Sequence, residues 1–108
     1  MMKKQDSIPD LSQKEAVVLG VLLSSLAHEM FGLEIVEQSS GMLKRGTIYV
    51  TLQRMEQKGI LDSRSEARPK PEIGIPRRMY RVTGLGESAF KMYKVAYVKL
   101  GELIASTQ

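Results

Sequence analysis

The chain of 108 residues contains no cysteine and no tryptophan, and His28 is its single histidine. The absence of cysteine excludes a disulfide framework and a thiolate metal site. We also find no Ser/His/Asp arrangement, no paired carboxylates in a Gly-rich setting and no phosphate-binding loop. For His28 we expect a capping or partly buried structural role. The sequence therefore predicts no enzyme, no cofactor and no metal.

Long hydrophobic runs are also absent. The longest, Ala16–Ala27, covers twelve residues and is interrupted by glycine and serine. A membrane-spanning helix needs about 20 apolar residues. The segment before this run carries aspartates and a proline, unlike a signal peptide. We therefore expect a single cytoplasmic domain with no membrane partner.

The net charge of +4 is unevenly distributed along the chain. Residues 1–40 hold three lysines and six acids, whereas residues 41–81 hold ten Lys/Arg and four acids. Residues 82–108 are nearly neutral, with three lysines and two acids. A basic block is consistent with a solvated face or with an anionic partner such as DNA.

The first helix is expected to begin at Ser12, because Ser12-x-x-Glu15 has the spacing of a capping box. It is predicted to run to about His28 and is apolar on nearly every side. A helix without a polar face is buried by more than one neighbour. In so small a domain this suggests a second chain, and Val18 and Leu22 are assigned to that dimer surface.

A second helix is predicted from Phe31 or Gly32 to Ser39, and a third from Gly46 to about residue 58, ended by Gly59. Placing the third helix at 100° per residue divides it into two faces. The core stripe consists of Ile48, Leu52 and Met55. The opposite face carries Val50, Gln53 and Gln57, flanked by Thr47, Tyr49 and Arg54.

Two strands follow, at about residues 60–66 and Met79–Val82. The segment between them, Ala67–Pro76, has three prolines, which cannot donate to a strand ladder. The sequence thus predicts a mainly α fold with a small β-hairpin, arranged as a winged helix-turn-helix. Residues 60–83 would form the wing, and the preceding helix would be the recognition helix.

Thr83 is expected to cap a last helix that runs toward Ser106. One apolar stripe would pack on the domain, and a second, surplus stripe predicts an interface. The residues of this helix assigned to dimerisation are Phe90, Tyr93, Tyr97, Leu100 and Ile104.

The candidate DNA contacts come from the third helix and the wing. Base reading is assigned to Gln53 for adenine, Val50 for a thymine methyl and Arg54 for guanine or phosphate. Phosphate contact suits hydroxyls and cations near a helix N-terminus and along a loop. The residues assigned to it are Lys44, Arg45, Thr47, Tyr49, Arg64, Arg68, Lys70, Arg77 and Arg78.

Three ordered motifs resemble the PadR family of bacterial transcriptional regulators. The first is Phe31-Gly-Leu-Glu-Ile35. The second comprises Gly46-Thr-Ile-Tyr49, Leu52-x-Arg-Met-Glu56 and Lys58-Gly-Ile-Leu61, and the third is Arg77-Arg-Met-Tyr-Arg-Val-Thr83 with Gly86. The resemblance covers residues 12 to about 90. The chain departs from the family at Val50, where members usually have proline.

The resemblance implies a winged helix-turn-helix that dimerises through its first and last helices and usually represses transcription. It implies the compact subgroup with one C-terminal helix, divided into a tail (1–11), a DNA-binding domain (12–83) and a dimerisation helix (84–108). The hypothesis is a homodimeric repressor that binds double-stranded DNA at an inverted repeat. The alternatives are a winged-helix module that binds an acidic protein, and a regulator with a small-molecule effector between its subunits.

Overall fold

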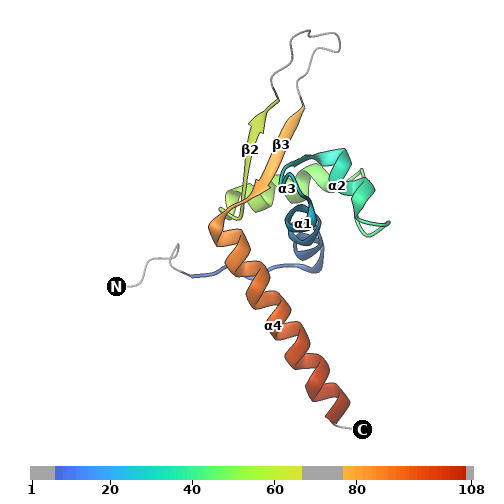
Figure 1. The fold of residues 1–108 in the computed structure, drawn as a ribbon, viewed down its shortest axis with the longest axis vertical. Helices are drawn as coiled ribbons and strands as arrows, with labels where there is room; N and C mark the ends of the chain where they lie inside the picture. Colours follow the sequence, from blue (N-terminus) through green and yellow to red (C-terminus); the bar gives the residue numbers. More distant parts are fainter. Residues whose placement is uncertain (1–6, 67–76, 107–108) are drawn as a thin grey trace.

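The computed structural model describes residues 7–66 and 77–106. Four helices and a small sheet follow one another along the chain. They are α1 (Gln13–Ser24), β1 (Met30–Phe31), α2 (Gly32–Gln38), α3 (Ile48–Gln57), β2 (Leu61–Ser65), β3 (Arg78–Val82) and α4 (Gly84–Ser106). Helices α1 to α3 gather at the base of the β2–β3 hairpin, and α4 extends away from them (Figure 1). This arrangement confirms the predicted mainly α winged helix-turn-helix.

Helix α1 begins as predicted but ends early. The Ser12 Oγ accepts a hydrogen bond from Glu15 N (3.1 Å), and Glu15 Oε1 accepts one from Ser12 N (2.9 Å), which completes the capping box. The helix stops at Ser24, whose hydroxyl donates to the carbonyl of Val21. Serine hydroxyls compete in this way with helical bonds. The predicted extension to His28 is wrong: His28 is exposed at a φ of 56°.

The sheet has one strand more than predicted. Its order is β1-β3-β2, with both pairs antiparallel. Met30 lies opposite Tyr80, and Ser63 lies opposite Tyr80 on the other side. β1 has only two residues, too few for an alternating pattern to be visible in the sequence.

The core explains why α1 is apolar all round. Helix α1 packs against α2, α3, β3 and α4 of its own chain. Val18 and Leu22 are completely buried there. Their assignment to a dimer surface is therefore wrong, because elements of the same chain cover every side that they occupy.

Helix α4 packs on the domain only through its first turns. Thr83 Oγ1 accepts from Gly86 N (3.0 Å) and donates to the carbonyl of Gly59 (2.7 Å), so the predicted cap is present. Gly86 and Ala89 are buried, whereas from Lys94 onward every described side chain of the helix is exposed. In the part of the chain that the structure describes, none of the helices is long and apolar enough to cross a membrane.

Candidate nucleic-acid interface

Helix α3 has the two faces that the sequence predicts. Ile48, Leu52 and Met55 are buried in the core. Val50 and Gln53 point the other way and are exposed. An exposed valine beside a glutamine gives this face an uncharged strip, which suits contact with base edges.

Cations flank this strip. Lys44, Arg45 and Arg54 are exposed, and none of them has an ion pair with another described residue. The carbonyl of Lys44 accepts from the backbone N–H groups of Thr47 and Ile48, so the two cations lead directly into the first turn of α3. The Thr47 hydroxyl makes no capping bond. Lys44, Arg45 and the Thr47 hydroxyl, all without a side-chain partner among the described residues, thus lie together at the positive end of the helix dipole.

Tyr49 joins α3 to the start of α2. A Cβ placed on Gly32 would lie 2.7 Å from Cε1 of the Tyr49 ring, so the ring rests directly on this glycine. About half of the Tyr49 side chain remains exposed. The ring also borders a groove of about 530 Å³ between α2, α3 and the sheet. The groove is lined by Phe31, Gly32, Leu33, Tyr49, Ser65, Arg77, Arg78 and Tyr80.

Two of the predicted wing contacts are already paired with acids. Arg64 makes a bidentate pair with Glu29 (2.9 and 2.8 Å), and Arg77 makes one with Glu66 (3.0 and 3.2 Å). The Arg77 guanidinium also lies 4.1 Å from the centre of the Phe31 ring. Hydrogen bonds from Arg64 hold the pKa of Glu29 below its ordinary value. These arginines are thus oriented by the protein itself, unlike the cations beside α3.

Arg78 belongs to a polar chain that connects the wing to α3. It donates to the hydroxyls of Ser63 (2.9 Å) and Ser65 (3.1 Å). Ser63 in turn donates to Glu56 Oε2 (2.6 Å), near the end of α3. Beside them Tyr80 is buried, and this burial raises the pKa of its hydroxyl above 10.0. No local sequence pattern indicates this series of bonds, because its members are separated along the chain.

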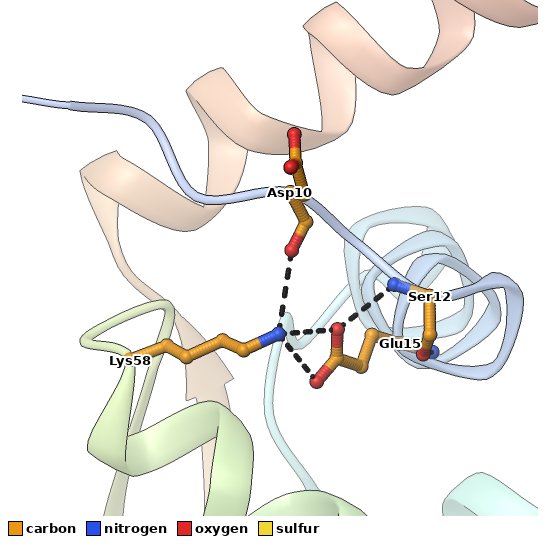
Figure 2. A network of polar contacts seen from close by, with 4 residues as sticks. All are labelled: Asp10, Ser12, Glu15 and Lys58. Carbon is orange, nitrogen blue, oxygen red and sulfur yellow. Dashed lines mark hydrogen bonds and ion pairs between the residues drawn. The ribbon is translucent and has the colours of Figure 1, made fainter.

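A second polar network holds the end of α3 against α1. Figure 2 shows Lys58 reaching Glu15 and the backbone of Asp10, with Ser12 bonded to the same carboxylate. Lys58 lies in the basic part of the sequence, yet its ammonium is paired with the buried carboxylate of Glu15. Arg68 and Lys70, the remaining predicted phosphate contacts, lie outside the described residues.

The surplus apolar stripe of α4 is exposed over its outer half. Tyr97, Leu100 and Ile104 each expose more than half of their surface, and the Tyr93 and Tyr97 rings lie 6.0 Å apart. Phe90 instead packs against α1 beside Gly20.

An apolar groove of about 370 Å³ lies beside the contact between α1 and α4. Its lining residues are Gln13, Ala16, Val17, Met42, Phe90, Tyr93, Lys94, Tyr97 and Val98.

The fold is a winged helix-turn-helix, an architecture typical of DNA-binding regulators. Residues 18–92 match the family described as "Transcriptional regulator PadR-like family". The chain therefore belongs to the PadR-like family of transcriptional regulators. No protein among the curated sequences matches it significantly.

Solved structures agree on the fold. A PadR family transcription regulator from Clostridium difficile R20291 is 22% identical, with 89% of this chain and 98% of that chain covered and a TM-score of 0.73. A PadR family regulator from Eggerthella lenta DSM 2243 is 21% identical, with 87% and 80% covered and a TM-score of 0.72. The PcaV regulator from Streptomyces coelicolor, in complex with its natural ligand, is 18% identical, with 92% and 64% covered and a TM-score of 0.71.

Proposed function

We propose that this chain is a sequence-specific, non-enzymatic transcriptional repressor that binds an inverted-repeat operator as a homodimer. The observation that carries the proposal is the exposed face of α3. There an uncharged strip, Val50 and Gln53, lies among three cations that have no partner among the described residues. Such a face combines base reading with phosphate attraction. A repressor acts where the DNA is, so we place it in the cytoplasm.

The proposed dimer uses α4. Its outer half exposes Tyr97, Leu100 and Ile104 over more than half of their surface. Exposed apolar surface of this extent is typical of an interface. The groove between α1 and α4 would receive α4 of the second copy, against Val17 and Met42. In this division residues 12–83 bind DNA and residues 84–108 join the two copies.

Replacing Tyr97 with glutamate would bury a charge in this proposed interface. We expect Tyr97→Glu to give a folded monomer in sedimentation equilibrium, whereas Glu87→Gln, an exposed change in the first turn of the same helix, should leave a dimer. A dimer of unchanged stability in Tyr97→Glu would contradict the proposed interface.

The geometry of a symmetric dimer sets the spacing of the two operator half-sites. Two copies of α3 would enter the major groove about one helical turn, or roughly 34 Å, apart. Phosphate contacts by the cations would make the affinity steeply dependent on salt. A gel shift with the region upstream of the chain's own gene, competed by random DNA, tests the proposal. Selective retardation supports a repressor, whereas equal weak retardation of both DNAs supports a module that binds an acidic protein.

A second candidate function is ligand sensing at the α1–α4 groove, as an alternative to its occupation by α4 of the second copy. Phe90, Tyr93 and Tyr97 give this groove aromatic walls, and its volume of about 370 Å³ suits a small molecule. PcaV, a regulator of similar fold, has been solved in complex with its natural ligand, which supports this candidate. Thermal melting against a panel of aromatic compounds tests this candidate, because a ligand that binds the folded state raises the Tm.

A further inference from the structure

The ammonium group of Lys58 is paired within the chain, although 36% of the side-chain surface remains exposed. Its Nζ donates to Glu15 Oε1 (2.7 Å), to Glu15 Oε2 (2.9 Å) and to the carbonyl oxygen of Asp10 (3.3 Å), as Figure 2 shows. A lysine ammonium has three N–H donors. All three are therefore used, and none is left for a DNA phosphate.

Lys58 connects the end of one helix to the start of another. Its backbone N–H donates to the carbonyls of Arg54 and Glu56, which makes it the C-cap of α3. Glu15 lies in the first turn of α1 and is only 4% exposed. Its carboxylate is also bound by the N–H of Ser12. The carboxylate is thus fixed from two sides, and Lys58 is fixed with it.

Directional polar contacts add to the apolar contacts of α3. Ile48, Leu52 and Met55 face the core, and hydrophobic contact has no directional preference. Charge-assisted hydrogen bonds are directional and short. Glu56, two residues before Lys58, adds a second fixed point through its bond to Ser63 of the wing. The C-terminal end of α3 is therefore held to α1 and to β2 at once.

Because α3 is a rigid rod, a change of its angle at the C-terminal end displaces its N-terminal end. The helix has 10 residues, and at 1.5 Å per residue it is about 15 Å long. A rotation of about 10° around its C-terminal end would move its first turn by roughly 2.5 Å, while binding constellations tolerate only about 0.5 Å. The first turn carries Tyr49 and Val50, which we assign to the DNA.

We propose that Lys58 is a positioning residue for DNA recognition: paired with Glu15, it sets the angle of α3 and makes no contact with DNA itself. The inference rests on the proposed DNA-binding function. It distinguishes Lys58, whose ammonium is bound to Glu15, from Lys44, a lysine just before α3 that has no partner among the described residues. Lys58 would act on the selectivity for a DNA sequence, and Lys44 would act on the salt-dependent affinity for any DNA.

The test compares Glu15→Gln/Lys58→Met with the control variant Lys44→Met. Glutamine at position 15 keeps the capping box, since Gln serves there as well as Glu, and the paired change leaves no buried charge without a partner. The dissociation constants of the full chain are measured for a duplex that the wild type selects from a random pool, and for a random duplex, at several salt concentrations. Thermal melting reports the fold.

We expect the paired variant to melt cooperatively and to lose at least tenfold in its preference for the selected duplex. The salt slope on random DNA should stay at the wild-type value. Lys44→Met should keep the preference and lower the slope by about one. If the paired variant does not fold, Glu15→Gln alone is used; it keeps the Lys58 charge, and the same loss of preference with an undiminished slope is expected.

Two results would overturn the inference. One is a salt slope lowered in the paired variant as in Lys44→Met, which would make Lys58 a phosphate contact. The other is a folded variant, paired or single, with the wild-type preference, which would make the pair purely structural. A wild-type chain that selects no duplex would instead contradict the proposed function.

Discussion

Gly32 and Tyr49 are in direct contact: a Cβ on Gly32 would lie 2.7 Å from Cε1 of the Tyr49 ring and 3.1 Å from its hydroxyl oxygen. Gly32→Ala should therefore push the ring aside. Because the ring is half exposed and free to turn outward, we expect a modest loss of about 1 kcal/mol in the free energy of unfolding. The affinity for DNA should fall several-fold, since Tyr49 lies in the first turn of α3.

The matched control for this prediction is Gly32→Ala made together with Tyr49→Ala. Once the ring is gone, alanine at position 32 should be neutral or slightly stabilising, because alanine favours a helix over glycine by about 1 kcal/mol. A double-mutant cycle with chemical denaturation measures this. Additive effects of the two changes would show that the contact is unimportant.

Arg45, just before α3, and Arg64, in the wing, should differ in their effect on DNA binding. Arg45 has no partner among the described residues, whereas Arg64 is held by Glu29. Replacing Arg45 with glutamine should lower the slope of log K against log salt by about one. Arg64→Gln should change the slope less, because this arginine must leave Glu29 to reach a phosphate. Fluorescence anisotropy at several salt concentrations measures both slopes, and equal changes would contradict the account.

Two glycines in the first turn of α4 should respond in opposite ways. A Cβ on Gly86 would overlap the carbonyl oxygen of Ile60 and lie 2.7 Å from Val82 Cγ1, whereas a Cβ on Gly84 would meet nothing within 4 Å. Gly86→Ala should cost about 3 kcal/mol of unfolding free energy, since backbone has to move. Gly84→Ala should be close to neutral. Urea unfolding measures the free energy of unfolding of both variants. Similar values would show that α4 does not pack tightly against the backbone of Ile60.

The pair of Glu29 and Arg64 predicts a response to acid. Hydrogen bonds from Arg64 lower the pKa of Glu29 from the ordinary value of 4.5. A lowered pKa in the folded state means that the pair stabilises the wing fully above pH 4.5 and less as the pH falls through the lowered pKa. An NMR titration of the Glu29 carboxyl should give a midpoint below 4.5 in the wild type and a higher one in Arg64→Gln. An unchanged midpoint in Arg64→Gln would exclude this cause.

Local patterns predicted much of this fold. The Ser12–Glu15 capping box, the stripe of Ile48, Leu52 and Met55, and the Thr83 cap each depend on neighbours a few residues apart. The resemblance to the PadR family, confirmed over residues 18–92, predicted that these elements combine into a winged helix-turn-helix.

What the sequence did not predict depends on contacts over long distances. Val18 is apolar because four elements of its own chain surround α1, and no helical wheel distinguishes that from a dimer surface. The partners of Lys58 are 43 and 48 residues away along the chain. The count of charges along the sequence therefore includes Lys58 and Arg64 in a basic block, although both are paired with acids of the same chain.

The most direct test of the central claim is selection of DNA from a random pool by the wild type and by Gln53→Ala. The account predicts that the wild type enriches an inverted repeat whose half-sites lie about 10 base pairs apart from centre to centre. Gln53→Ala should lose preference at one symmetric pair of positions, by about 1–3 kcal/mol each, and keep the rest of the repeat. Recovery of no sequence by the wild type, or of an identical repeat by Gln53→Ala, would contradict the claim that the exposed face of α3 reads the operator.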